Sequence, residues 1–329
     1  MRHPTVDELP LDSLDPGIHR FWLRMVDDGL GQAVRAPVLV ARGERPGPTV
    51  GVSSTVHGDE VNGIAVIHRL LGTLDATRLA GTVVAVPVVN VPAFHQHSRR
   101  TPHGLDLNHH FPGRADGNDI QVYAHRVMQK FVARIDLLVD LHTASRGREN
   151  CLYVRADMSS PRIAQMAYLQ RPQIILHNPS FDPTLRGAAE AVGVPAITVE
   201  VGNPSRFQRE YIRRSVIGLR SVLAQEGMIP PRAVTPGDPP VLCSRSEWLT
   251  TDDGGLLRVF PKVTERVEAG QPIARLVDAF GDELRTYEAP HDGIVIGRAV
   301  DPVAATGARI LHLGVLATAA DGLVERTDG

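Results

Sequence analysis

The stretch from Thr49 to Leu71, TVGVSSTVHGDEVNGIAVIHRLL, decides the fold prediction. Its first part, Thr49 to Val56, is a short run of mostly apolar and β-branched residues, which is typical of a buried strand. From Glu60 to Leu71 the apolar residues follow the spacing of one face of a helix. The HGDE sequence at positions 57–60 is therefore predicted to lie at a turn from a strand into a helix.

Two side chains of this turn, and one from a later strand, have the chemistry of metal ligands. His57 and Glu60 are three residues apart, a spacing that can bring an imidazole and a carboxylate to one side, and Gly58 lets the chain bend sharply. His142 follows the apolar stretch Ile135 to Leu141, so its ring should emerge at the carboxyl edge of the sheet. Two histidines, a carboxylate and a water form a catalytic zinc set. We expect one zinc ion per chain, although cobalt or manganese could use the same ligands.

A further carboxylate, Glu200, follows the apolar stretch Pro195 to Val199. Burying an acidic residue in such a run costs free energy unless the residue is paired or functional. A catalytic zinc needs a nearby carboxylate that takes the proton of the attacking water. Glu200 is therefore the predicted general base, and the alternative is a strand-end glutamate that faces solvent or pairs with an arginine.

The composition bears on which partners the protein binds and in which cellular compartment it works. The chain has 329 residues, with 35 basic and 37 acidic side chains and a net charge of −2, which gives no case for nucleic acid or an anionic membrane surface. The cysteines Cys151 and Cys243 lie far apart, which fits a reducing compartment better than a disulfide framework. The amino terminus lacks the apolar core of a signal peptide, so we expect a cytoplasmic protein, with a homo-oligomer left open.

Strand-like and helical patterns alternate from about residue 36 to residue 226, with helical patterns at Ile120 to Ile135 and Arg206 to Gln225. This alternation predicts an α/β fold in which helices flank a mostly parallel or mixed sheet. Residues 228–240 are rich in proline and are predicted to be a linker. The expected organisation is a catalytic domain at residues 1–227, this linker, and a small β domain at residues 241–329.

The carboxyl-terminal region contains short strand-like pieces punctuated by glycine, which predict a small antiparallel unit of the barrel or hammerhead kind. Parts of it resemble the half-repeats of biotinyl and lipoyl carrier domains. Those carriers present a lysine at a hairpin tip, whereas the matching stretch here, Asp278 to Leu284, has none. We therefore expect a structural unit that packs against the catalytic cleft and shapes it.

Four motifs in a fixed order carry a family resemblance: HGDE at 57–60, SRRTPHGLDLNHHFPG at 98–113, DLHTAS at 140–145 and TVEVG at 198–202. In this order they resemble the succinylglutamate desuccinylase and aspartoacylase family, which has a zinc carboxypeptidase-like fold. The resemblance implies a zinc ion held by His57, Glu60 and His142. It also implies that Glu200 activates the water that attacks an amide carbonyl.

The resemblance assigns roles within the second motif as well. Arg99 would polarise the carbonyl oxygen and stabilise the oxyanion, with Arg100 as the alternative contact to the substrate. Asp106 would accept a hydrogen bond from His57 and orient its ring, as carboxylates do for zinc-bound imidazoles. Asn108 would hydrogen-bond the substrate.

One position departs from the family pattern, which has arginine after the asparagine where this chain has His109. The family arginine grips a substrate carboxylate through two parallel hydrogen bonds, and a mostly neutral histidine cannot reproduce them. Either the substrate differs from N-acylated aspartate or glutamate, or another arginine supplies the contact. The sequence offers Arg146, Arg148 and Arg206 for that contact.

The function predicted from these observations is a zinc-dependent amidohydrolase that removes an acetyl- or succinyl-type group from a small N-acylated amino acid or amine. One alternative is a zinc carboxypeptidase that acts on short peptides. Another is a catalytically silent protein of the same fold that binds a ligand in the cleft.

Overall fold

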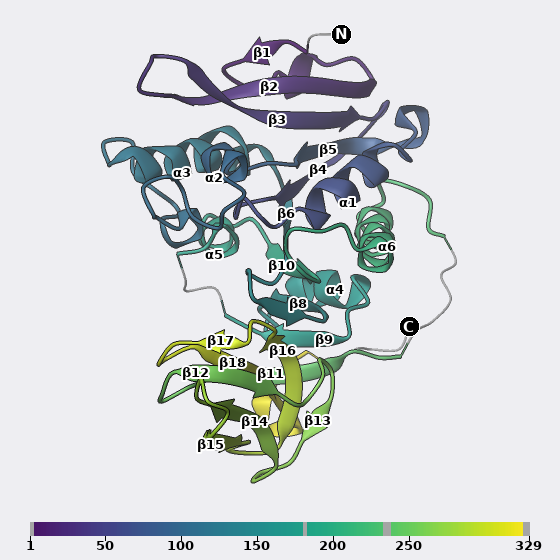
Figure 1. The fold of residues 1–329 in the computed structure, drawn as a ribbon. Helices are drawn as coiled ribbons and strands as arrows, with labels where there is room; N and C mark the ends of the chain where they lie inside the picture. Colours follow the sequence, from purple (N-terminus) through teal and green to yellow (C-terminus); the bar gives the residue numbers. More distant parts are fainter. Residues whose placement is uncertain (1–2, 180–182, 233–237, 325–329) are drawn as a thin grey trace.

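One mixed sheet of 14 strands runs through the chain, and a second sheet of four strands lies at its carboxyl-terminal end (Figure 1). The computed structural model describes residues 3–179, 183–232 and 238–324. The order of strands in the large sheet is β1-β2-β3-β5-β4-β6-β10-β8-β9-β11-β18-β16-β13, with β7 paired to β16. The small sheet has the order β15-β14-β12-β17.

The first strands form an amino-terminal edge of the sheet, and only the last of them lies within the region, from about residue 36, where strand-like patterns were predicted. They are β1 (Thr5–Val6), β2 (Gly17–Asp27) and β3 (Ala33–Arg42). β2 and β3 form an antiparallel pair, and β3 joins the rest of the sheet through β5. Phe21, Leu23 and Met25 of β2 are buried and alternate with exposed residues, as expected for a strand with one face on the core.

Most residues of the central strands are buried. They are β4 (Arg45–Ser54), β5 (Ala80–Val86), β6 (Leu137–His142), β7 (Arg148–Asn150), β8 (Leu152–Ala156), β9 (Ile174–His177) and β10 (Ala196–Val201). β6 lies between β4 and β10 and is parallel to both. The carboxyl ends of these three strands therefore meet at one edge of the sheet, where ligands of α/β proteins bind.

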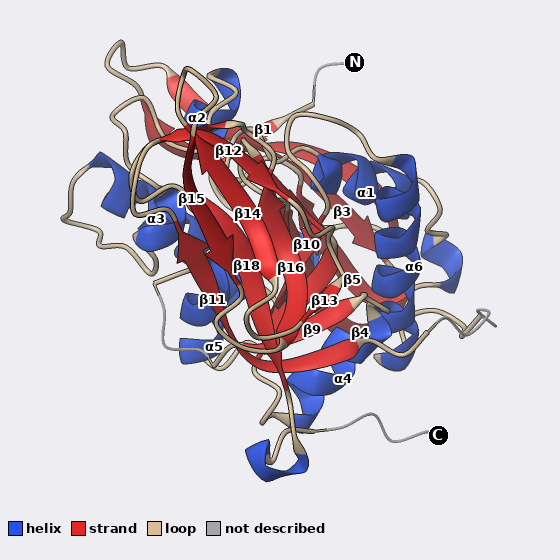
Figure 2. Cartoon of the chain, turned by 60° about the horizontal axis from the view of Figure 1, so that its bottom comes forward, coloured by secondary structure: helices blue, strands red, loops and turns tan. Residues whose placement is uncertain are grey.

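Helices cover both faces of this central region (Figure 2). They are α1 (Asn62–Leu71), α2 (Val91–His95), α3 (Asp119–Lys130), α4 (Pro161–Leu169), α5 (Leu185–Ala191) and α6 (Arg209–Gln225). Buried residues of α1, α4 and α6 form one core cluster with the sheet. Those of α2, α3 and α5 form a second cluster, which also includes the buried side chains of β2.

The carboxyl-terminal region is built of β-strands, as predicted, apart from a 3-10 turn at Ala319–Asp321. Its strands are β11 (Val241–Thr250), β12 (Gly255–Val259), β13 (Arg266–Val267), β14 (Pro272–Val277), β15 (Glu283–Glu288), β16 (Gly293–Ala299), β17 (Val303–Ala304) and β18 (Arg309–Leu316). β11 pairs in parallel with β9, and β16 pairs with β7. The region is therefore hydrogen-bonded into the same sheet as the central strands.

The structure confirms the predicted fold class, an α/β fold with a carboxyl-terminal β region. The helix expected from Glu60 begins at Asn62, and the helix expected to reach Ile135 ends at Lys130 and is followed by a 3-10 turn. Within the predicted linker, Met228 and Ile229 are buried in the core. Residues 233–237 of that linker lie outside the described part of the chain.

Candidate active site

The turn that carries HGDE is held tightly in the structure. After β4 ends at Ser54, the buried residue Thr55 adopts the left-handed conformation, with φ of 58°, and its hydroxyl donates to the carbonyl of Glu60 over 3.1 Å. Gly58 packs directly on the backbone of α2, because a Cβ at this position would lie 2.1 Å from the carbonyl group of Ala93. A non-glycine φ of this kind is uncommon and clusters at functional sites. The HGDE turn is therefore rigid and holds His57 and Glu60 in fixed positions.

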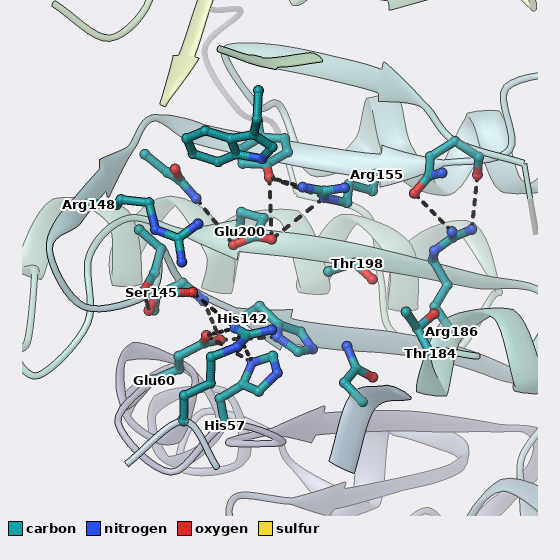
Figure 3. Close-up of a pocket in the computed structure, with 18 of the residues that line it drawn as sticks. His57, Glu60, His142, Ser145, Arg148, Arg155, Thr184, Arg186, Thr198 and Glu200 are labelled. Atoms are coloured by element: carbon teal, nitrogen blue, oxygen red, sulfur yellow. Dashed lines mark hydrogen bonds and ion pairs between the residues drawn. The ribbon is translucent and has the colours of Figure 1, made fainter. Parts of the chain in front are cut away.

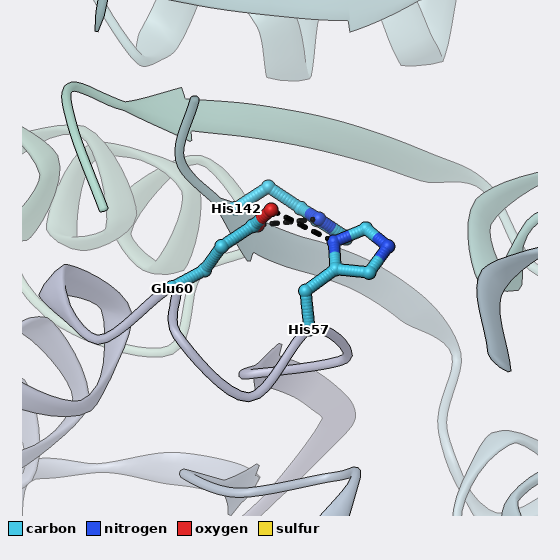
Figure 4. A group of neighbouring side chains, drawn as sticks. All are labelled: His57, Glu60 and His142. Carbon is cyan, nitrogen blue, oxygen red and sulfur yellow. Dashed lines mark hydrogen bonds and ion pairs between the residues drawn. The ribbon is translucent and has the colours of Figure 1, made fainter. Parts of the chain in front are cut away.

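His57, Glu60 and His142 form a compact and buried cluster (Figure 4). Glu60 lies between the two rings, with one carboxylate oxygen 2.9 Å from Nδ1 of His57 and the other 3.0 Å from Nδ1 of His142. One potential ligand atom from each residue lies within 4.8 Å of the others. This group could hold a metal ion, because two imidazoles and a carboxylate are the protein ligands of many catalytic zinc sites.

The Nε2 nitrogen of each histidine, on the side of the ring away from Glu60, lies beside a second carboxylate. Nε2 of His57 lies 3.1 Å from Asp106, and Nε2 of His142 lies 2.7 Å from Asp140, whose other oxygen accepts from Ser53 over 2.6 Å. In this structure Nδ1 of each ring lies within hydrogen-bonding distance of Glu60, and Nδ1 of His57 also lies 3.2 Å from Arg99. A metal would bind at Nδ1 after that nitrogen has lost its proton, while Nε2 donates to its carboxylate. Such carboxylate–histidine pairs are a regular feature of zinc sites, so the donor set fits the predicted ion.

The charges in this cluster reinforce one another. Burial disfavours the charged form of each histidine, but nearby carboxylates outweigh burial: Glu60 and Asp106 raise the pKa of His57, and Asp140 and Glu60 raise that of His142. Burial also opposes ionisation of Glu60, yet the two histidines hold its pKa well below the usual range. A negatively charged Glu60 is the form that a cation requires.

Glu200 lies on β10, next to His142 in the register with β6, and is buried. Its carboxylate accepts long hydrogen bonds of 3.4 Å from Asn150 and from the hydroxyl of Tyr153. Nε of Arg155 lies 3.7 Å away, so the ion pair is loose. Burial raises the pKa of Glu200, and Arg155 opposes that rise only in part.

Arg99 reaches the cluster from the loop that follows α2. Its Nε donates to Asp106 over 3.0 Å, and the same guanidinium lies 3.3 Å from Glu60 and 3.0 Å from the hydroxyl of Ser145. About a third of the Arg99 side chain remains exposed. The structure thus places a fixed cation beside the candidate metal ligands and at the surface of the cavity.

These groups line one cavity of about 340 Å³ (Figure 3). His57, Glu60, His142, Arg99 and Glu200 all contribute to its wall. The cavity also receives Trp248 and Arg309 from the carboxyl-terminal β region. This region helps to shape the cleft, as the sequence analysis expected.

The structure places two of the three predicted substrate-binding residues at the cavity and one outside it. Asn108 and His109 line the cavity, and Asn108 also accepts a hydrogen bond from the backbone of Leu185 over 2.9 Å. Arg100 is exposed, is not among the cavity-lining residues, and donates to the carbonyl of Gly104 over 3.3 Å. Of the three arginines offered as substitutes for the family arginine, Arg148 alone is among the lining residues.

Several residues at this site were missed by the sequence analysis. Asp140 carried a signal, because it lies two residues before His142 in the same strand and side chains two apart share a face. Arg155, Trp248 and Arg309 carried no comparable signal, since they meet the site only through strand pairings between distant segments.

The model of the succinylglutamate desuccinylase/aspartoacylase catalytic domain matches residues 46–225. The chain belongs to this family. The prediction of family made from the four motifs is therefore confirmed. Members of this desuccinylase/aspartoacylase family hydrolyse the amide bond of N-acyl amino acids, so the protein is a hydrolase of the N-acyl amino acid deacylase type, as predicted.

Individual known proteins match almost the whole chain. The N-alpha-acetyl-L-2,4-diaminobutyric acid deacetylase of Halomonas elongata is 26% identical over 314 residues, which cover 90% of this chain and 91% of the relative. A succinylglutamate desuccinylase from Silicibacter sp. TM1040 has a similar structure, with a TM-score of 0.83, 24% identity and coverage of 94% and 97% of the two chains. The product-bound ectoine utilization protein of Ruegeria pomeroyi has a TM-score of 0.84, 23% identity and coverage of 93% and 97%.

The two solved structures show that the desuccinylase/aspartoacylase fold extends over the carboxyl-terminal β region of this chain as well. No helix within the described residues is long and apolar enough to cross a membrane.

Proposed function

We propose that the protein is a zinc-dependent deacylase that removes an acetyl- or succinyl-type group from a small N-acylated amino acid or amine. The observation that carries the proposal is that one cavity brings Glu200 together with the His57–Glu60–His142 cluster. The Halomonas elongata relative is a deacetylase of an N-acetylated diamino acid. The name of this relative favours acetyl over succinyl as the acyl group that is removed.

A zinc ion held by His57, Glu60 and His142 would supply a Lewis acid for the carbonyl group and a water of lowered pKa. The protein contributes the fixed geometry of the ligands, through the two carboxylates that hold the imidazoles and through the rigid HGDE turn. Because these three side chains are already oriented, they can bind a metal ion without rearranging.

Glu200 would accept the proton of the attacking water and return it to the leaving amine. A general base works best when its pKa lies nearer the working pH than that of an ordinary carboxyl group, and burial raises the pKa of Glu200 in that direction. The long hydrogen bonds from Asn150 and Tyr153 orient the carboxylate while binding it weakly. The carboxylate therefore stays available as a base.

Arg99 would donate to the carbonyl oxygen as negative charge develops there. Its contacts with Asp106 and Ser145 fix the guanidinium beside the cluster before substrate binds. Donors that are already oriented need no rearrangement during the reaction, which is the basis of oxyanion stabilisation.

The size of the cavity fits a small substrate. A volume of about 340 Å³ lies near the lower end of the range of small-molecule sites. A volume of this size suits an acylated amino acid.

Release of free amine from N-acetyl, N-succinyl and N-formyl amino acids and diamines by zinc-loaded protein tests the proposal. We expect turnover of one acyl class and a fall in kcat of roughly 10²- to 10⁴-fold in Glu200→Gln. The variant should retain one zinc per chain, because Glu200 is not among the clustered ligands.

The matched control is His57→Ala, which removes a ligand and should lose both zinc and turnover. Near-normal turnover in Glu200→Gln would remove Glu200 from the mechanism. No turnover of any member of the panel by a protein that retains zinc would contradict the deacylase assignment.

A further inference from the structure

The cavity wall is strongly basic. Five arginines line it, Arg99, Arg148, Arg155, Arg186 and Arg309, against two glutamates, Glu60 and Glu200. The two glutamates have the roles described above. Asp106 and Glu190, which lie behind the wall, neutralise Arg99 and Arg186. The arginines that the protein does not neutralise are the candidates for binding a negatively charged substrate.

Three of these arginines are held by protein acceptors. Arg99 donates to Asp106, Arg155 donates to the hydroxyl of Tyr153 over 2.8 Å, and Arg186 is paired with Glu190 over 2.8 Å. Their guanidinium groups are engaged within the protein, so none of the three is the first choice for a ligand carboxylate.

Arg148 and Arg309 differ from the other three. Neither guanidinium has a hydrogen-bonding or ion-pairing partner among the described residues, and each lies over the ring of Trp248, with Cζ at 5.2 Å for Arg148 and 4.7 Å for Arg309 from the ring centroid. Burial and the charge of Arg309 lower the pKa of Arg148, which nevertheless stays protonated. Two like charges on one ring repel each other, and a bound anion would relieve that repulsion.

Both arginines lie on paired strands, since Arg309 begins β18 and is opposite Thr250 of β11. Arg148 begins β7, which pairs with β16, and Gly147 before it accepts hydrogen bonds at its carbonyl from Val300 and Asp301. Gly147 has φ of 76°, a conformation that glycine adopts without strain. Arg148 thus extends from an anchored loop into the cavity that Glu200 also lines (Figure 3).

The Trp248 ring, over which the two arginines lie, is held in place by contacts with a neighbouring strand. Trp248 of β11 is directly opposite His312 of β18 in the register, and the two rings stack at 4.6 Å with an angle of 7° between their planes. His312 is buried and hydrogen-bonds to Ser246 over 2.8 Å. Trp248 is therefore an oriented platform, and planar guanidinium groups stack well on such a surface.

We propose that Arg148 and Arg309, carried on Trp248, form a clamp that binds the carboxylate of the substrate. The clamp replaces the family arginine whose place is taken here by His109. This inference rests on the proposed deacylase function and assigns the recognition of the substrate's carboxylate to these two residues. Simple N-acyl diamines are then poor substrates.

The test compares N-acetyl-L-amino acids with their carboxamides, pairs that differ only at the carboxyl group. In the wild-type protein the carboxylates should be preferred in kcat/KM by about 10- to 100-fold, the range expected for hydrogen bonds to a charged group. Arg148→Met and Arg309→Met should each reduce this preference at least about tenfold, chiefly through KM, and should leave the carboxamides nearly unchanged. A rise in KM is expected because the carboxylate lies away from the bond that breaks.

The matched control is Arg146→Met, because Arg146 is exposed and is not among the residues that line the cavity. It should keep the wild-type preference, and Arg148→Lys should keep part of it. The same preference in Arg148→Met and Arg309→Met as in the wild type would overturn the clamp. So would a wild-type protein that does not distinguish carboxylates from carboxamides.

If no member of either series is hydrolysed, the proposed function fails, and calorimetric titration with the same pairs then decides on the clamp. Binding that favours carboxylates and loses this preference in both variants supports the clamp without catalysis. Binding without that preference, or no binding of the carboxylates, overturns it.

Discussion

At Glu200, the burial that positions the carboxylate also sets its affinity for protons. Burial raises its pKa above the ordinary value of 4.5, and the charge of Arg155 opposes the rise. Because a general base must be ionised, activity is lost as the pH falls through this raised pKa. We predict that kcat/KM falls on the acid side with an apparent pKa above 4.5.

A second variant separates Glu200 from the metal ligands, whose protonation also lowers activity in acid. Removing the charge in Arg155→Met should move the acid limb to higher pH, because the charge of Arg155 lowers the pKa of Glu200. The profiles should be measured at saturating zinc, with metal content determined at each pH. Activity that stays constant down to pH 4.5, or an acid limb that Arg155→Met does not move, would refute this account of Glu200.

Asp140 supports the metal ligands without being one of them. It accepts from His142 over 2.7 Å and from Ser53 over 2.6 Å, so Asp140→Asn removes the charge that holds the imidazole. We predict a loss of zinc affinity of about 10- to 100-fold, measured by competition with a chromogenic chelator. Asp136→Asn is the control, because Asp136 is exposed four residues earlier, and equal zinc affinity in the two variants would contradict the prediction.

The individual ligands could be predicted because polar residues that end apolar strands stand out in a sequence. His142 and Glu200 are of this kind, and the short spacing between His57 and Glu60 adds to the signal. The contacts of Arg148 and Arg309 could not be predicted. They depend on a tryptophan placed by the register between β11 and β18, and sequence spacing does not encode that register.

At the scale of elements, the HGDE turn depends on a close approach between two backbones. In Gly58→Ala the new methyl group would lie 2.1 Å from the carbonyl of Ala93, so the turn or α2 must move. We predict a loss of about 1–3 kcal/mol in the free energy of unfolding, together with weaker zinc binding, because His57 precedes this residue and Glu60 follows two positions later.

Urea unfolding and zinc titration measure these two effects. The control is Gly29→Ala, where no atom lies within 4 Å of the new methyl group and the change should stay within about 0.5 kcal/mol. A Gly58→Ala protein as stable as this control, with unchanged zinc affinity, would show that the turn tolerates movement.

Elements with strong periodic patterns were predicted well, and their ends less well. The central strands and α6 appear where apolar patterns indicated them, whereas α1 begins two residues later than expected because the backbone of Glu60 is bonded into the turn at His57. β2 was not predicted, since its buried and exposed residues alternate and it lacks the continuous apolar run of a central strand.

At the scale of the whole molecule, the catalytic region and the carboxyl-terminal β region share a sheet and a core cluster. β9 pairs with β11, β7 pairs with β16, and Tyr153 and Ile174 pack with Cys243 and Ile294. We predict one cooperative thermal unfolding transition, with near-ultraviolet and far-ultraviolet circular dichroism changing together. Two separate transitions, with the β region melting first, would contradict this coupling.

The composition indicated two regions and a linker, but it could not indicate how the regions join. A proline-rich stretch marks where regular structure stops, whereas strand pairing across that stretch depends on segments far apart in the sequence. Trp248 and Arg309 enter the cavity only because of that pairing. The site therefore belongs to the whole chain rather than to the matched family domain alone.

The central claim, that a metal bound at the His57–Glu60–His142 cluster is required for deacylation, is tested most directly by metal removal and add-back. Amine release from an N-acetyl-L-amino acid substrate would be measured before chelation, after chelation, and during titration with zinc. We predict that activity disappears on chelation and returns in proportion to added zinc, reaching its full value at one equivalent per chain. Full activity in the stripped protein would contradict the account.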